Sequence, residues 1–389
     1  MKTLWARLGL TLAVLTLLAA GAAPTSASGL RFTAITVGSG HACAITAQGR
    51  AYCWGSNYAG QLGDGTTTVS GVNGPQAVIG GYRFASISTH EYHTCALTAQ
   101  GKAYCWGENY AGELGDGTTT VSGVNGPQAV IGGLRFTKVV TGEGNTCALT
   151  ARGNAYCWGS NYAGGLGDGT TADSGVKGPQ AVIGGLKFTD ITAGENTMCA
   201  TTAQGKAYCW GENYAGGLGD GTTAASGVKG PQAVIGGIKF SMVATSISYH
   251  SCALTARGNA YCWGSNYAGE LGDGTTAASG VKGPQAVIGG LKFTSIIAGY
   301  HTCALTARGK AYCWGPNGSG ELGNGVNTPS GVNGPQAVSG NLKFEIISAG
   351  ESTTCALTAQ GRAYCWGYNG DGVLGDGTLV DSNVPVAVQ

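Results

Sequence analysis

The chain has 389 residues, a formal net charge of +1 and only 11% charged residues. Because the net charge is close to zero, the chain has no general electrostatic attraction to nucleic acid. Hydrophobic residues make up 43% of the chain, which excludes a disordered tract even though 72 residues are glycine. The composition therefore predicts a folded, glycine-rich protein.

The first segment in chain order, residues 1–28, has the pattern of a secretory signal peptide. Lys2 and Arg7 precede an apolar run at 8–20, and small residues follow it. The run is short for a membrane span, although an anchor that stays attached is the alternative interpretation. We therefore expect an exported protein, secreted or periplasmic, that has no membrane attachment after cleavage at Ala22 or Ala27.

Residues 29–389 consist of seven copies of a unit of about 52 residues, each with a segment such as CAITAQGRAYCW at 43–54. Each copy is expected to supply four short strands, which resemble RFTAIT, CALTA, AYCWG and PQAV. No helical periodicity follows the signal peptide. The pattern predicts an all-β, seven-bladed β-propeller with four antiparallel strands per blade. We expect the final VPVAVQ, at 384–389, to close the ring by pairing with the first blade.

The two cysteines of each copy are ten residues apart. If Gly49 adopts a left-handed conformation at the hairpin turn, Cys43 faces Cys53 as a non-hydrogen-bonded pair, whose Cα atoms approach to about 4.5 Å. Oxidising conditions outside the cell favour a disulfide, and zinc sites use shorter spacings. The seven expected pairs are Cys43–Cys53, Cys95–Cys105, Cys147–Cys157, Cys199–Cys209, Cys252–Cys262, Cys303–Cys313 and Cys355–Cys365.

The same register separates the two faces of each hairpin. Cys43 and Ile45 share one face, whereas Ala44, Tyr52 and Trp54 share the other. Large residues then oppose small ones, which allows neighbouring blades to interdigitate. We therefore expect the Trp and Tyr of the AYCWG segments to form core rather than a ligand cage.

Differences between the copies concentrate just before the first cysteine, as in GSGHA and THEYHT, and after Trp-Gly, as in SNYAGQ and YNGDGV. In an antiparallel blade, the loops after strands one and three emerge on the same side, so both variable segments are expected on one face. All acidic residues except Asp190 and Glu345 fall in these loops, and most basic residues fall at the opposite turns. Asp64 and its equivalents in LGDG are expected to form turns.

Carboxylates mixed with Tyr and His on one face predict a surface that anchors a protein. A solvated rim without a partner is another interpretation. A metal site built from His41, His93 and neighbouring Glu is disfavoured because the ring separates these residues, and we expect no cofactor. The candidate binding residues are Glu91, Tyr92, His93, Glu143, Glu195, Tyr249, His250, Tyr300, His301, Glu351 and Tyr368.

Catalytic motifs are absent from the sequence: it has no Ser/His/Asp ordering, nucleophile elbow, phosphate loop or HExxH. The expected pairing leaves no cysteine as a nucleophile. The chain is therefore predicted not to be an enzyme, and a hydrolase or lyase that uses paired carboxylates is the weaker alternative.

The segment HTCALTARGKAYCWGPNGSGELGNG resembles the repeat of the regulator of chromosome condensation family, His-x-x-x-Leu-x-x-x-Gly-x-x-x-x-Trp-Gly followed by Gly-x-Leu-Gly. The resemblance covers residues 29–389 and implies a seven-bladed propeller. Some copies depart from the pattern, with Asn145 or Thr197 near the place of the histidine. The paired cysteines resemble those of secreted bacterial members of the family. One known kind of these members inhibits β-lactamases. The nuclear member of the family acts on a GTPase and chromatin.

From these observations we expect a monomeric, exported recognition protein whose acidic, Tyr-rich face binds a protein that is basic at the contact. An inhibitor of an extracellular enzyme is one version of this function. Carbohydrate binding at the cell envelope or matrix is the alternative, because Tyr, Asn and carboxylates also suit sugars. Guanine-nucleotide exchange, by family analogy, is disfavoured because a signal peptide would place the chain away from a nuclear GTPase.

Overall fold

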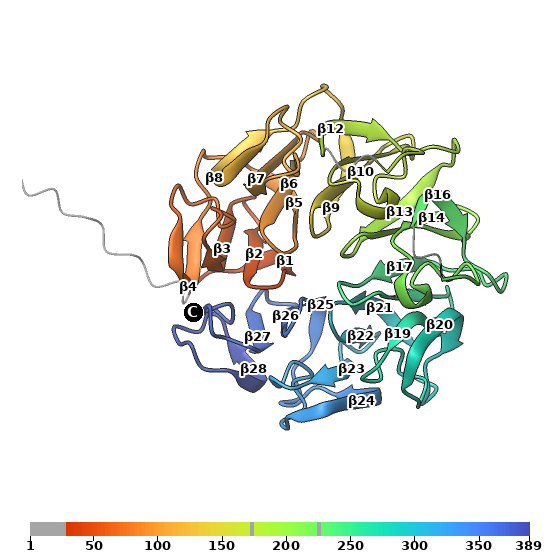
Figure 1. Cartoon of the computed structure of the whole chain (residues 1–389). Helices are drawn as coiled ribbons and strands as arrows, with labels where there is room; N and C mark the ends of the chain where they lie inside the picture. Colours follow the sequence, from red (N-terminus) through yellow and green to blue (C-terminus); the bar gives the residue numbers. More distant parts are fainter. Residues whose placement is uncertain (1–28, 172–174, 224–226) are drawn as a thin grey trace, which may run out of the picture.

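The computed structural model describes residues 29–171, 175–223 and 227–389, and the expected signal peptide at 1–28 lies outside them. The described chain forms seven four-stranded antiparallel sheets around a common centre (Figure 1). Each sheet takes four consecutive strands, so the fold is the predicted seven-bladed propeller. The short 3-10 helices η1 (Tyr162–Gly164) and η2 (Tyr214–Gly216) lie in loops of blades three and four. Within these residues, no helix has the length and apolar character needed to cross a membrane.

The strands of each blade run in chain order from the centre to the rim (Figure 1). The inner strands are β1 (Phe32–Val37), β5 (Phe84–Thr89), β9 (Phe136–Thr141), β13 (Phe188–Ala193), β17 (Met242–Thr245), β21 (Phe293–Ala298) and β25 (Phe344–Ala349). The second strands are β2 (His41–Thr46), β6 (His93–Thr98), β10 (Asn145–Thr150), β14 (Thr197–Thr202), β18 (His250–Leu254), β22 (Thr302–Thr306) and β26 (Thr353–Thr358).

The third strands are β3 (Ala51–Asn57), β7 (Ala103–Asn109), β11 (Ala155–Gly159), β15 (Ala207–Gly211), β19 (Ala260–Asn266), β23 (Ala311–Asn317) and β27 (Ala363–Gly367). The outer strands are β4 (Thr68–Ala77), β8 (Thr120–Ala129), β12 (Val176–Ala181), β16 (Val228–Ala233), β20 (Ala277–Ala286), β24 (Thr328–Ala337) and β28 (Ser382–Ala387). Most outer strands begin well before the predicted PQAV, because irregular pairing at Gly55 and its equivalents admits the glycine-rich segment into the sheet.

Closure of the ring differs from the expectation. The last strand, β28, pairs with β27 in its own blade and not with the first blade. Blades seven and one instead meet through the bonds that join every other pair: Phe32 N–H donates to Gly361 O, and Gly377 N–H donates to Asn73 O. Because each blade is complete within one repeat, the ring closes by packing between blades.

The hairpin prediction is confirmed in every repeat. Gly49 has φ +79° at the turn, and Cys43 lies opposite Cys53 with Ala44 opposite Tyr52. All fourteen cysteines form the seven expected disulfides, and each pair has its Cα atoms 4.1 Å apart. A cross-link of this kind removes disorder from the unfolded chain and contributes roughly 2–3 kcal/mol.

The hydrophobic core is divided among the seven interfaces between blades. At the interface of blades one and two, the Cys43–Cys53 disulfide and Leu62 pack with Trp106 and Phe84 of the next blade. The tryptophans are fully buried, as predicted, whereas the tyrosines of the AYCWG segments are half-buried beside the phenylalanines. Each blade therefore presents a disulfide on one side and a tryptophan on the other.

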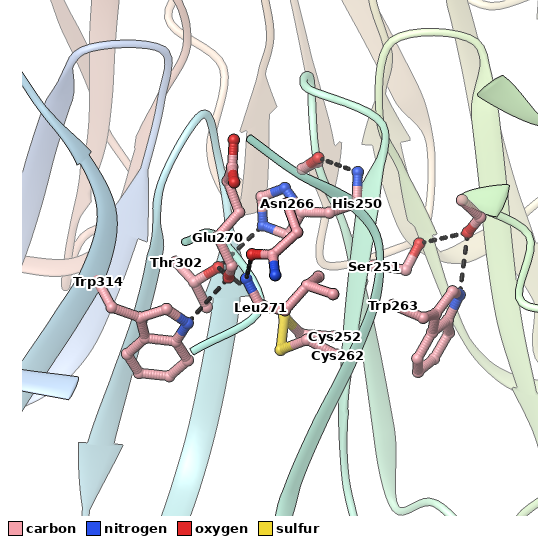
Figure 2. The surroundings of a disulfide bond; sticks show 12 residues. His250, Ser251, Cys252, Cys262, Trp263, Asn266, Glu270, Leu271, Thr302 and Trp314 are labelled. Carbon is pink, nitrogen blue, oxygen red and sulfur yellow. Dashed lines mark hydrogen bonds between the residues drawn. A yellow bond between two sulfur atoms is a disulfide. The ribbon is translucent and has the colours of Figure 1, made fainter. Parts of the chain in front are cut away.

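A hydrogen bond from the indole N–H to a backbone carbonyl fixes each tryptophan to the preceding blade (Figure 2). Trp314 Nε1 donates to Glu270 O at 2.9 Å, and Thr302 Oγ1 donates to the same carbonyl at 2.9 Å. The equivalent indole bond recurs at all seven interfaces, and Trp54 closes the ring by donating to Val373 O at 2.8 Å. At five of the seven interfaces a Thr or Ser hydroxyl donates to the same carbonyl, whereas Ala42 and Met198 stand at this position in the other two. These bonds satisfy the indole N–H and the hydroxyls that are buried at the interfaces.

The glycine of each Leu-Gly pair packs directly on this tryptophan. Gly272 has φ +65°, and a Cβ there would lie 2.6 Å from Trp314 Nε1. We predict that Gly272→Ala lowers the free energy of unfolding by about 2–4 kcal/mol, because it adds a clash to an unfavourable φ. Denaturant unfolding of the oxidised protein measures the loss.

Gly290→Ala is the matched control, since Gly290 has φ +66° and nothing within 4 Å of its Cβ position. This control should lower the free energy of unfolding by only about 1–2 kcal/mol, which is the cost of placing alanine at a positive φ. Equal losses in the two variants would show that contact with the tryptophan is not what requires glycine at position 272.

Candidate functional site

Both sets of variable loops lie on one face, which we call the loop face. At its centre, carboxylates occupy equivalent loop positions of blades two, three, four and seven: Glu91, Glu143, Glu195 and Glu351. These four glutamates line a hollow of about 180 Å³ at the mouth of the central channel. The rest of its lining consists of Ser39, His90, Ile247 and Tyr300. Among these described lining residues, none is Lys or Arg.

Burial and crowding of like charges raise the pKa values of glutamates at the mouth. Burial raises the pKa of Glu195 to about 7, and repulsion from Glu143 adds to this. Burial, followed by repulsion from Glu91, also raises the pKa values of Glu143 and Glu351. Asn196 Nδ2 donates to Glu143, but an amide does not neutralise a carboxylate. A cation placed at the mouth would therefore relieve the repulsion.

Behind the mouth, the inner strands enclose a channel of about 220 Å³. Lys138 and Asp190 form an ion pair within it, the only ion pair in the described part of the chain. His90 lies between mouth and channel and is buried, with no hydrogen-bond partner for either ring nitrogen among the described residues. Burial lowers the pKa of His90 to about 4, so the ring adds no positive charge at neutral pH.

Tyrosines surround the acidic mouth. The ring of Tyr92 packs on that of Tyr58 with centroids 5.3 Å apart, and Tyr249 packs on Tyr214 at 4.9 Å. Tyr92 and Tyr368 help to line a second hollow, of about 360 Å³, beside the mouth. Tyr300 and Tyr368 are 43% and 37% exposed. The predicted tyrosines therefore join the four glutamates on one continuous face.

The predicted histidines do not lie on this face. His93, His250 and His301 are buried, and their Nε2 atoms bond Thr146, Thr302 and Thr354 of the next blade at 2.9, 2.8 and 2.6 Å. Their expected exposure is wrong for a physical reason. Each lies two residues before a cysteine, so it shares the face of the strand that packs against the next blade. These histidines join blades, and the candidate surface consists of the glutamates and tyrosines.

The loops after the third strands also contain acids that are not part of the surface. Glu113, Glu270 and Glu321 are almost fully buried, and each accepts a backbone N–H two residues earlier in its loop. Burial raises the pKa of Glu113 to about 7. The negative charge of the face is therefore smaller than a count of loop acids suggests.

A buried asparagine that sequence reasoning missed organises the same loop. Asn57 Oδ1 accepts from Leu62 N–H, and its Nδ2 donates to Asp64 Oδ1. Asp64 in turn accepts from Thr66 N–H at 2.9 Å, which confirms the predicted turn-forming role. Repetition of Asn after Trp-Gly in every copy was the available signal. In the described residues, no group of three His, Cys, Asp or Glu is arranged to hold a metal ion.

Burial lowers the pKa of His93 to about 3, whereas an unfolded histidine titrates near 6.5. Below pH 6.5 the unfolded chain binds the proton and the folded chain does not, so acid removes stability that the neutral histidine supplies. We predict that His93→Asn costs about 1 kcal/mol at pH 7 through the lost bond to Thr146. Between pH 7 and pH 5 this cost should fall by about 2 kcal/mol, so that the Asn variant becomes more stable than the native protein at pH 5.

Denaturant unfolding at a series of pH values measures both quantities. Thr353→Asn is the control, because Thr353 occupies the equivalent position of blade seven and does not titrate. A cost of His93→Asn that stays constant from pH 7 to pH 5 would contradict the prediction.

Comparison with known proteins gives the family. Residues 82–389 match the RCC1-like domain, and residues 32–61 and 48–97 match the regulator of chromosome condensation (RCC1) repeat. The ultraviolet-B receptor UVR8 of Arabidopsis thaliana is 30% identical over 361 residues, which cover 91% of this chain and 81% of UVR8.

Two solved structures have the same fold. Prp20p from Saccharomyces cerevisiae, described with its binding properties to Gsp1p and histones, has a TM-score of 0.79 at 22% identity, over 89% of this chain and 87% of Prp20p. Human WBSCR16 has a TM-score of 0.77 at 21% identity, over 87% of this chain and 94% of that structure. At these identities the two structures support the fold alone. With the match at 82–389 and the similarity to UVR8, the chain belongs to the regulator of chromosome condensation (RCC1) repeat family.

Proposed function

We propose that this protein is a recognition propeller that binds another protein through the loop face. The observation that carries the proposal is the set of four glutamates at the channel mouth, beside the exposed Tyr300 and Tyr368 and the half-buried Tyr92 and Tyr249. Tyrosine supplies a large contact area with little loss of side-chain freedom, and the carboxylates favour a partner that is basic at the contact. The contacts would come from Glu91, Tyr92, Glu143, Glu195, Tyr249, Tyr300, Glu351 and Tyr368.

Relatives support binding as the general role. The yeast protein Prp20p, which has the same fold, is described with its binding to Gsp1p and histones. The polar residues that line the mouth are the four glutamates, Ser39, Tyr300 and the neutral His90. A role as a binding regulator needs only a rigid scaffold that presents variable loops.

The finer proposal is an exported inhibitor, of the secreted bacterial kind, that covers the active site of an extracellular enzyme. The signal-like sequence at 1–28 and the seven disulfides support export, because disulfides persist in oxidising compartments. A rigid ring whose loops are tied by disulfide-bonded hairpins loses little freedom on binding, which favours tight association.

The first test removes the aromatic contacts. In the variant with Tyr92, Tyr249 and Tyr300 all changed to Ala, we expect at least about a tenfold loss of affinity for proteins captured from the source organism's secreted fraction. The matched control changes Lys206 and Arg257 on the opposite face to Gln and should retain every partner. Undiminished capture by the tyrosine variant would refute the loop face as the binding surface, and saturable binding to a glycan array instead would favour a carbohydrate ligand.

The second test uses pH. Because the pKa of Glu195 is raised to about 7, its negative charge increases from pH 6 to pH 8. Association with a basic partner should therefore strengthen over this range, and Glu195→Gln should flatten the dependence. Surface plasmon resonance at constant ionic strength measures it. A stronger association at pH 6 than at pH 8 would contradict the assignment of a basic partner.

A further inference from the structure

Another hollow lies on the face opposite the loops, where the hairpin of blade six meets the segment that leads into blade seven. Its volume is about 580 Å³, within the usual range for small-molecule sites. Four cationic side chains line it: Lys292, Arg308, Lys310 and Lys343. Its apolar lining comes from Tyr312, Val338 and Leu342. We call this hollow the blade-six pocket.

The repeats differ at this point. The hairpin turns read AQGR, AQGK, ARGN, AQGK, ARGN, ARGK and AQGR in chain order, so only blade six has cations at both variable positions. These two residues are Arg308 and Lys310. They concentrate charge at one place on a ring whose other hairpins carry a single cation.

The segment after β24 also departs from the repeat. Five copies have Gly-Gly here, whereas the sixth has Gly340-Asn341. Asn341 keeps the left-handed backbone with φ +53°, which asparagine tolerates better than most residues. At the five equivalent glycines, such as Gly290, a Cβ would meet nothing within 4 Å. A side chain at this position therefore adds a polar group to open space and does not fill the core.

The charges in the pocket are largely uncompensated. Lys292 donates to Asn259, an amide, and Lys310 Nζ lies 5.3 Å from the centroid of the Tyr312 ring. The acidic Glu345 lines a neighbouring hollow with Arg308 and Lys343 and makes no ion pair within the described residues. Four cations beside one carboxylate leave an excess of positive charge.

We propose that the blade-six pocket binds a small organic anion, namely a phosphate or sulfate monoester carried on a flat apolar group. The guanidinium of Arg308 matches two oxygens of such a group, and the lysines add point charges. Tyr312, Val338 and Leu342 contact the apolar body, and the Asn341 amide donates to the ester. The site is independent of the loop face, so either can fail without the other.

The test uses 1-naphthyl phosphate, titrated into the full chain by isothermal calorimetry at low salt. We expect saturable one-site binding at least about tenfold tighter than that of inorganic phosphate, which lacks the aromatic body, or of 1-naphthol, which lacks the phosphate. Titration of 1-naphthyl sulfate distinguishes the two esters. Absence of saturable binding by both naphthyl esters overturns the proposal.

Variants locate the site. Arg308→Gln with Lys310→Gln should weaken binding at least about tenfold, since charge-assisted hydrogen bonds are lost. Asn341→Gly, which restores the residue of the other copies and so preserves folding, should weaken it about threefold. Glu345→Gln should tighten binding by removing a nearby negative charge.

Arg257→Gln is the matched control, because Arg257 occupies the position of Arg308 on the blade-five hairpin. Its affinity for 1-naphthyl phosphate should stay within twofold of the native value. A loss in Arg257→Gln equal to that in the Arg308 and Lys310 variant would overturn the proposal, since it would indicate attraction to the whole basic face.

Discussion

The structure depends on one repeated interaction, the bond from a buried indole to a carbonyl of the preceding blade. At that carbonyl, Trp and in most blades Thr or Ser donate together, and the Leu-Gly turn leaves no room for a Cβ beside the ring. The disulfide of the preceding blade packs against the same indole. A large aromatic group, its polar handle and a covalent cross-link thus meet at the centre of every interface.

This arrangement separates the frame, which is the repeated strands and the interfaces between blades, from the loops and turns that differ between repeats. The frame repeats almost unchanged, so variation is confined to loops that the frame holds rigidly. On one side the loops carry the glutamates and tyrosines of the channel mouth. On the other side the turns carry most of the basic residues, which reach their highest density at Arg308 and Lys310. A chain with almost no net charge therefore has two faces of opposite charge.

Much of the fold could be predicted because alternation along a hairpin is a local property. Cys43 facing Cys53, and Trp54 facing the other side, follow from counting outward from Gly49. The same counting places His93 on the side of Cys95, so its burial was within reach of the sequence. Ring closure was not, because the final strand has the same composition whether it pairs with β27 or with the first blade. The buried state of Glu113 was also hidden, since Gln61 and Gly165 fill the same loop position in other copies.

Each blade is one uninterrupted repeat, and the interface between the seventh and first blades has the same indole and backbone hydrogen bonds as the others. The position of the chain ends is therefore arbitrary with respect to the frame. A gene encoding such a protein can exchange or reorder whole units by recombination without breaking a sheet. New combinations of loops can then arise from old ones while the scaffold stays the same, which is a direct route from near-identical copies to diverse surfaces.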